Sequence, residues 1–104
     1  MLTLSIRYTL DPNKLADFRA YAEAEQEPIH RNGGKIVGYF MPTDFSGPTN
    51  EAIGLIEFTS LGAYEEYRAR LANDPDHKKY AKRLEDSGVI VAMNRTIIQR
   101  VGEP

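Results

Sequence analysis

The sequence predicts an α+β fold in which a four-stranded antiparallel sheet carries its helices on one face. Apolar residues alternate with polar ones over residues 2–10, and a long β-branched segment occupies residues 89–98, both of which are typical of strands. Between these segments, apolar residues recur at helical spacing. Stretches rich in Gly, Pro and Asn separate these segments. The chain has 104 residues and 11.7 kDa, with 41% hydrophobic and 27% charged residues, so we expect one globular domain over 1–104.

The first predicted strand covers residues 2–10, because every second side chain from Leu2 to Leu10 is apolar. Asp11 and Pro12 then indicate the start of a helix. Pro28 should kink or end that helix because it lacks an amide hydrogen, and the Asn-Gly-Gly at 32–34 supplies the stop. The expected inner face of the helix carries Leu15, Phe18, Ala22 and Ile29.

Two more strands are expected at residues 35–41 and 52–58, joined as a hairpin by the turn-rich loop 42–50. Ser60 can cap a second helix. The expected inner face of this helix carries Leu61, Tyr64, Arg68 and Leu71.

The Asn-Asp-Pro at 73–75 restarts a shorter helix, which Ser87 and Gly88 should end. Residues 89–98 form a last strand and 101–104 a frayed tail. The resulting order, β-α-β-β-α-β, favours the ferredoxin-like plait, because connections are short and crossovers right-handed.

Both faces of the predicted sheet are apolar, although helices cover only one. Val37, Tyr39, Met41, Ile53 and Leu55 are expected to point away from the helices, with one alternating set of residues 89–98. A monomer would expose a large apolar patch, so we expect a two-fold homodimer in which the sheets of the two copies face each other. The loop 42–50 is the alternative cover. Arg95, in the middle of the last strand, would cross the dimer interface or bind a ligand.

Composition excludes several classes of function. The chain has no cysteine, so disulfides, thiolate nucleophiles and cysteine-bound metals are absent. A net charge of -2 and a pI near 5.7 argue against nucleic acid or anionic membranes as partners. Without a membrane-length apolar run or a signal peptide, we expect a cytoplasmic protein. The two histidines lack metal-ligand spacing and no nucleotide-binding motif occurs, so we expect neither a metal nor a bound cofactor.

Dispersed segments resemble the NIPSNAP family over nearly the whole chain. They are Arg7-Tyr8-Thr-Leu10, Ile29-His30-Arg31-Asn-Gly-Gly34, Gly38-Tyr39-Phe40, Asn50-Glu51, the run from Leu61 to Arg68, and Asn94-Arg95-Thr-Ile-Ile98. The resemblance implies a dimeric α/β barrel. That superfamily includes monooxygenases without cofactors, lactone isomerases, haem-degrading enzymes and many members with no assigned reaction.

Two side chains are the main candidates for chemistry. Arg68 lies on the expected inner face of its helix, where it would anchor an anion or carbonyl group, pair with Glu51 or Glu57, or extend to solvent. His30 would be a general base, because its ordinary pKa lies near neutrality, or would simply favour the negative end of the helix dipole. His77 is expected on the surface.

Other candidates would line a pocket between the sheet and the helices. Tyr8 should face the helices beside Phe58 and Tyr64. If Gly38 and Gly54 stand opposite each other in the hairpin, they leave a notch that admits a flat ligand or is filled by a neighbouring ring.

With His30 at the mouth of this pocket, we expect a cofactor-independent monooxygenase or isomerase that acts on a small aromatic or carbonyl compound. The alternatives are binding of a small carboxylate or phenol without catalysis, and a dimerisation module.

Overall fold

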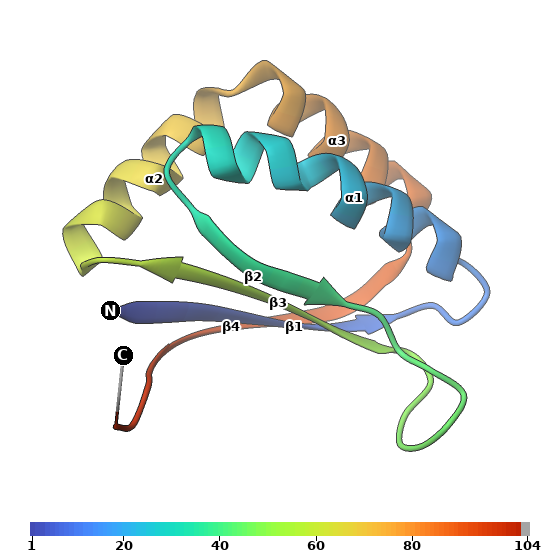
Figure 1. The fold of residues 1–104 in the computed structure, drawn as a ribbon. Helices are drawn as coiled ribbons and strands as arrows, with labels where there is room; N and C mark the ends of the chain where they lie inside the picture. Colours follow the sequence, from blue (N-terminus) through green and yellow to red (C-terminus); the bar gives the residue numbers. More distant parts are fainter. Residues whose placement is uncertain (103–104) are drawn as a thin grey trace.

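The computed structural model describes residues 1–102, which form four strands and three helices (Figure 1). In chain order they are β1 (Leu2–Leu10), α1 (Leu15–Arg31), β2 (Lys35–Phe40), β3 (Glu51–Phe58), α2 (Leu61–Asn73), α3 (Pro75–Ser87) and β4 (Ile90–Gln99). The strand order β2-β3-β1-β4 and antiparallel pairing confirm the ferredoxin-like prediction. Residues 101 and 102 follow β4 without regular structure, and positions 103 and 104 of the expected tail lie outside the described residues.

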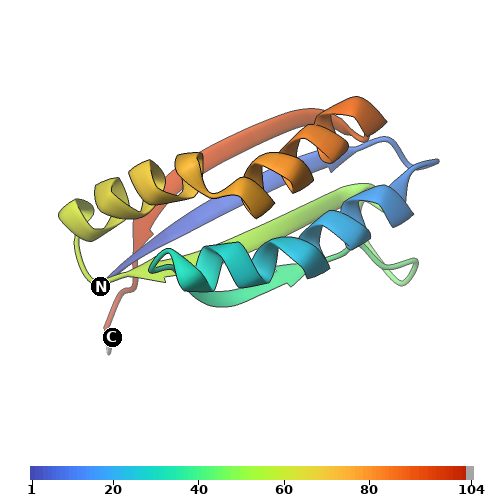
Figure 2. The same cartoon turned by 90° about the horizontal axis from the view of Figure 1, so that it is seen from above.

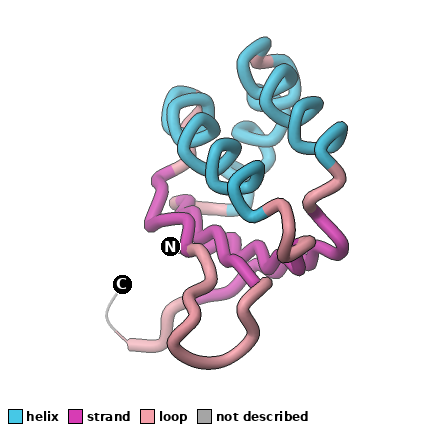
Figure 3. The backbone as a smooth tube through the Cα atoms, turned by 90° about the vertical axis from the view of Figure 1, so that its right-hand side faces the viewer, coloured by secondary structure: helices cyan, strands magenta, loops and turns pink. Residues whose placement is uncertain are grey.

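All three helices lie on one face of the sheet, as Figures 2 and 3 show from above and from the side. Alternate side chains of β1 face them and are buried. They pack against Phe18 and Ile29 of α1 and against Tyr67 and Leu71 of α2. The buried set of β1 is Leu4, Ile6, Tyr8 and Leu10. The core therefore lies between the helices and the two central strands, β3 and β1.

The ends of α1 differ from the prediction. The helix begins at Leu15 and not at Asp11, because the Asp11 carboxylate closes a turn by accepting from the amide of Asn13 at 2.9 Å. Pro28 does not end the helix, which continues to Arg31. The proline ring is fully buried, and the Pro28 carbonyl accepts from the backbone and side chain of Asn32, so packing and a cap stabilise this last turn.

Helix α2 begins at the predicted cap, where Ser60 Oγ accepts from the amide of Ala63 at 3.1 Å. Its buried face is rotated from the expected one: Tyr67 and Leu71 are buried, whereas Leu61 and Arg68 are exposed. The next helix, α3, is as long as α2, so the expectation of a shorter helix is wrong. It ends at Gly88, whose φ of 70° lies in the left-handed region, as predicted from that glycine.

A β-bulge at Val37 reverses the predicted facing of β2. Ile36 pairs with Ile56, but Gly38 pairs with Leu55, so one residue of β2 is left over between them. Because strand side chains alternate, one extra residue moves every later side chain to the other face. Tyr39 and Met41 therefore pack against the core, and the expectation that they point away from the helices is wrong.

Arg95 also differs from its expected position. It pairs with Ile6 of β1, whose side chain faces the helices, so Arg95 lies on the helix side and not on the outer face of the sheet. Ile53 and Leu55 do point away from the helices, because they alternate with buried residues of β3. This face is mixed and not wholly apolar, because the neighbouring side chains on the outer face of β1 are polar. They are Thr3, Ser5, Arg7 and Thr9.

Candidate functional site

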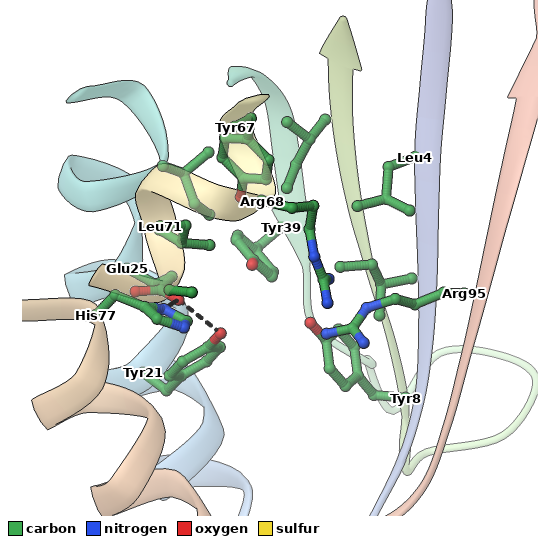
Figure 4. A pocket seen from close by; sticks show the side chains of 14 residues that line it. Leu4, Tyr8, Tyr21, Glu25, Tyr39, Tyr67, Arg68, Leu71, His77 and Arg95 are labelled. Atoms are coloured by element: carbon green, nitrogen blue, oxygen red, sulfur yellow. Dashed lines mark hydrogen bonds and ion pairs between the residues drawn. The ribbon is translucent and has the colours of Figure 1, made fainter. Parts of the chain in front are cut away.

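A cavity of about 130 Å³ lies between the sheet and the helices. Six elements besides the central strand β1 contribute to its wall, so the cavity forms only when the whole fold is assembled. Figure 4 shows it from close by. The lining residues are Leu4, Ile6, Tyr8, Tyr21, Glu25, Ile29, Tyr39, Ile56, Tyr67, Arg68, Leu71, Ala72, His77 and Arg95.

On the helix side of the cavity, a buried carboxylate joins α1 to α3. Glu25 is only 1% exposed, and its Oε2 accepts from the hydroxyl of Tyr21 at 3.0 Å and lies 2.5 Å from Nδ1 of His77. Burial, followed by the negative charge of Glu25, raises the pKa of Tyr21, so this hydroxyl stays protonated and donates. Among residues 1–102, Oε1 of Glu25 has no hydrogen-bond partner. Burying a carboxylate costs free energy of desolvation, and the hydrogen bonds of Tyr21 and His77 to Oε2 offset that cost.

The position of His77 follows from the start of α3. Asp74 caps this helix by accepting from the amides of Asp76 and His77 at 2.9 and 3.2 Å. Arg31 and Asn32, at the end of α1, hold the same carboxylate through hydrogen bonds of 2.8 to 3.0 Å. This junction fixes the first turn of α3 against α1, so His77 reaches Glu25 across the interface.

Asp74 remains ionised over a wide pH range. Burial disfavours its charged form, but hydrogen bonds from Asn32, Arg31 and the two amides outweigh that effect and lower the pKa to about 2.

On the sheet side of the cavity lie two guanidinium groups. Arg68 reaches in from α2 and Arg95 from β4, and Figure 4 shows both near Tyr8 and across the cavity from Glu25 and His77. Within residues 1–102 neither guanidinium forms a hydrogen bond or an ion pair with a side chain. Two neighbouring guanidinium groups are suited to bind an anion, because their planar geometry matches carboxylate oxygens.

Tyr8 places a protonated hydroxyl beside these cations. Burial raises its pKa to about 12, and the nearby positive charge of Arg95 opposes part of that rise. The hydroxyl can therefore donate to an anionic oxygen at neutral pH.

The structure brings together some of the predicted site residues and separates others. Tyr8 and Arg68 line the cavity as expected, with Tyr39 and Arg95, which were expected at the interface. His30 does not: it is exposed and lies near Gly33 and Lys35 on another part of the surface. The prediction that places His30 at the mouth of this pocket is therefore wrong.

Phe58 and Tyr64 lie outside the cavity lining. They form an aromatic cluster with Tyr67, at ring-centroid distances of 5.2 Å between Phe58 and Tyr64 and 4.8 Å between Phe58 and Tyr67. The rings of Phe58 and Tyr64 therefore pack beside α2 and do not border the open volume, whereas Tyr67 does.

The two strand glycines do not face each other. Gly38 pairs with Leu55, and Gly54 pairs with Tyr39, because of the bulge in β2. A Cβ on Gly54 would lie 2.7 Å from Cε1 of Tyr39, so the ring of Tyr39 occupies the notch. The second of the two sequence alternatives, a ring that fills the notch, is the one observed.

Glu25, Tyr21 and the inward position of His77 were not among the residues expected from the sequence. A signal for Glu25 was present: with Phe18, Ala22 and Ile29 it falls at three- and four-residue spacing on the buried face of α1. A glutamate in that row must have a partner, and Tyr21, four residues earlier, is one of them. His77 lies 52 residues from Glu25, so no local pattern indicates their contact.

Residues 4–102 of the chain match the model of the NIPSNAP family. The chain belongs to the NIPSNAP family. A NIPSNAP-like domain protein from Burkholderia xenovorans is 27% identical and has a TM-score of 0.80, with 99% of this chain and 89% of that chain covered. A NIPSNAP family protein of unknown function from Agrobacterium tumefaciens is 28% identical, with a TM-score of 0.80 and coverage of 94% and 86%.

A more distant structure shares the fold alone. A candidate antibiotic biosynthesis monooxygenase from Nitrosomonas europaea has a TM-score of 0.73 at 8% identity, with 98% of this NIPSNAP chain and 100% of its own covered. No curated protein matches the chain in sequence.

Residues 1–102 contain neither a metal-site cluster nor a membrane-spanning helix. No three His, Cys, Asp or Glu side chains there are grouped to share a metal ion. Nor does any helix in this range combine the length and the apolar character that crossing a membrane requires.

Proposed function

We propose that this NIPSNAP domain is an isomerase-type enzyme that binds a small carbonyl compound bearing an anionic group and moves a proton on it without a bound cofactor. The single observation that carries the proposal is the arrangement of the cavity. Two guanidinium groups that form no ion pair within residues 1–102 face a hydrogen-bonded histidine and glutamate across one small volume. A proton-transfer enzyme needs these two parts: a base beside the carbon and a positive site for the oxyanion.

In the proposed reaction, His77 is the general base. With the proton on Nδ1 donated to Glu25, the lone pair of Nε2 is free to accept a proton from the carbon next to the substrate carbonyl. The electrons of the C–H bond move to the carbonyl oxygen, which becomes an enolate oxyanion. Glu25 stabilises the imidazolium that forms, because its carboxylate lies against Nδ1.

Arg68, Arg95 and Tyr8 would stabilise the enolate oxygen and hold the anionic group of the substrate. Return of the proton from His77 to a different carbon completes an isomerisation with no net change in atoms or charge. The same enolate is also the first intermediate of an oxygenation in which molecular oxygen is the co-substrate. Binding without catalysis is the alternative function for the same cavity.

Proton exchange in D₂O tests this proposal directly. The protein is incubated with small 2-oxo carboxylates and acyl-substituted benzoates, and loss of the proton signal next to the carbonyl is followed by NMR. We expect exchange catalysed by the wild type to fall about 100-fold or more in His77→Gln. His30→Gln is the matched control, because His30 is exposed and remote from the cavity, and it should exchange at the wild-type rate.

Binding of the same compounds is measured in parallel by thermal shift. Arg68→Gln should lose the shift, whereas Arg7→Gln, on the outer face of β1, should retain it. Equal exchange by wild type and His77→Gln would remove His77 as the base. Binding that depends on Arg68 without any exchange would leave the non-catalytic alternative.

A further inference from the structure

The helix side of β4 carries an apolar strip that the helices leave uncovered. Met93 pairs with Tyr8 and Ile97 pairs with Leu4, both of which face the helices. Yet Met93 is 45% exposed and Ile97 is 41% exposed, whereas their partners on β1 are nearly inaccessible. We call Met93 and Ile97 the β4 strip.

The reason for this exposure is the position of β4. It is an edge strand of the sheet, and Figure 2 shows it along the outer side of α2 and α3. An exposed edge strand usually carries polar or charged side chains, so two large exposed apolar side chains in one row need another explanation.

The β4 strip is continuous with the cavity. Arg95 lies between Met93 and Ile97 in the same row, and its guanidinium lines the cavity beside Arg68. An anion held by these arginines therefore lies next to uncovered apolar surface. The alternate positions of β4, which face the other side of the sheet, include the polar residues Asn94 and Thr96.

The size of the cavity limits how much of a ligand it can enclose. A volume of about 130 Å³ is close to that of engineered cavities of about 150 Å³, which hold one benzene molecule. A ligand with a longer apolar part must extend out of the cavity. The local charge is also limited: Arg68 and Arg95 supply two positive charges against the one negative charge of Glu25, which leaves one positive charge for a monoanion.

We infer that the ligand is an amphipathic monocarboxylate, whose carboxylate is held by Arg68 and Arg95 and whose alkyl or aryl substituent lies along the β4 strip. This inference rests on the proposed anion site and adds the chemical class of the ligand. The apolar substituent covers side chains that would otherwise remain in water, and the arginine in the middle of the row fixes where the carboxylate lies.

Saturated monocarboxylates from propionate to decanoate provide the test, with binding to the full chain measured by calorimetry. We expect Kd to fall by about twofold for each added methylene, because a chain lying on one surface is only half buried, and then to level off once the strip is covered. Octanol, which has the same chain length as octanoate without the charge, should bind at least about tenfold more weakly than octanoate.

Two adjacent isoleucines give a matched pair of variants. Ile97 and Ile98 are 41% and 45% exposed but point to opposite faces of the sheet. Ile97→Ser should weaken octanoate binding by about threefold or more and leave propionate binding almost unchanged. Ile98→Ser should change neither. Circular dichroism checks that both variants fold.

Each contrary result has a distinct meaning. If affinity does not depend on chain length while Arg68→Gln abolishes binding of every carboxylate, the anion site stands and the β4 strip inference is wrong. Equal effects of Ile97→Ser and Ile98→Ser on octanoate would also overturn it. If sedimentation shows a dimer that Ile97→Ser dissociates and Ile98→Ser does not, the strip is covered by a second copy of the chain and not by a ligand. If no carboxylate binds at millimolar concentration, the proposed function fails as well.

Discussion

At the scale of single residues, Glu25 has the largest structural consequence. Its carboxylate is buried on the core face of α1 and is held by one residue of its own helix and one of α3. An ionisable group in that position is retained at a cost in desolvation, which is expected at a site that uses the charge. A histidine near a helix end, such as the exposed His30, is visible in sequence, whereas the partner that activates a histidine is not.

Removal of the Glu25 carboxylate should destabilise the protein. Glu25→Ala leaves His77 and the Tyr21 hydroxyl without their partner and opens space in the core, so we expect a loss of about 3 kcal/mol in the free energy of unfolding. Urea unfolding measures it. Glu27→Ala, two positions later on the exposed side of α1, should change stability by less than about 0.5 kcal/mol. A similar small value for Glu25→Ala would contradict the structural role of this pair.

A methyl group at Gly54 should alter the cavity. Its Cβ would lie 2.7 Å from Cε1 of Tyr39, so the ring that fills the notch must move, at a cost of about 1–3 kcal/mol. We expect Gly54→Ala to lower Tm and to weaken ligand binding, because Tyr39 lines the cavity. Gly62→Ala in α2, where the nearest atom is 3.8 Å from the added Cβ, should raise Tm or leave it unchanged. Unaltered Tm and binding in Gly54→Ala would show that Tyr39 moves freely.

At the scale of elements, the junction between α1 and α3 positions the proposed base. Arg31 and Asn32 at the end of one helix bind the carboxylate that caps the other. The sequence predicted a helix start at Asn73-Asp74-Pro75, and the structure confirms it. The interaction with Arg31 was not predicted, because it depends on the packing of two helices that are 43 residues apart at this contact.

The charge of Asp74 makes the junction sensitive to acid. Its pKa is lowered from the ordinary value of 3.8 to about 2, so the folded state binds the proton more weakly than the unfolded state does. The resulting stabilisation is fully present above about pH 4 and is lost as the pH falls through 2. We expect the Tm of Asp74→Asn to be several degrees lower at neutral pH and to depend less on pH between 4 and 2. A parallel decline of Tm in both proteins over that range would contradict this assignment.

At the scale of the whole molecule, the outer face of the sheet is the surface that a second copy would cover. Ile53 and Leu55 point out of this face, and Val37, Phe40 and Ile98 are 50%, 51% and 45% exposed. We propose that the protein is a homodimer through this face, although polar residues of β1 make the face less apolar than the sequence suggested. The inward positions of Tyr39 and Arg95 remove both from that interface.

Light scattering on the intact chain tests the homodimer. We expect twice the chain mass of 11.7 kDa at micromolar concentration. Leu55→Glu should shift the mass towards 11.7 kDa, because it places a charge in the proposed interface. Leu61→Glu is the matched control: Leu61 is 55% exposed on α2, on the helix side, and the variant should remain dimeric. A wild-type mass of 11.7 kDa would refute the dimer.

The order of strands and helices, the Ser60 cap, the Gly88 stop and the family all follow from local signals in the chain. Such signals suffice there because alternation, helical spacing and capping depend on residues only a few positions apart. Within the cavity, Tyr8 could be named in advance because it belongs to a regular alternating strand. Arg68 was also named, but from an expected inner face of α2 that the structure shows to be rotated.

Long-range packing decided the rest. One extra residue at Val37 in β2 turned Tyr39 towards the helices, and the pairing of β4 with β1 placed Arg95 in the cavity. The contact between Glu25 and His77 joins two helices that meet only after the chain has closed on the sheet. The packing of whole helices and strands against one another brings together side chains that are far apart in the sequence. The composition of this site therefore follows from the tertiary structure and not from local signals.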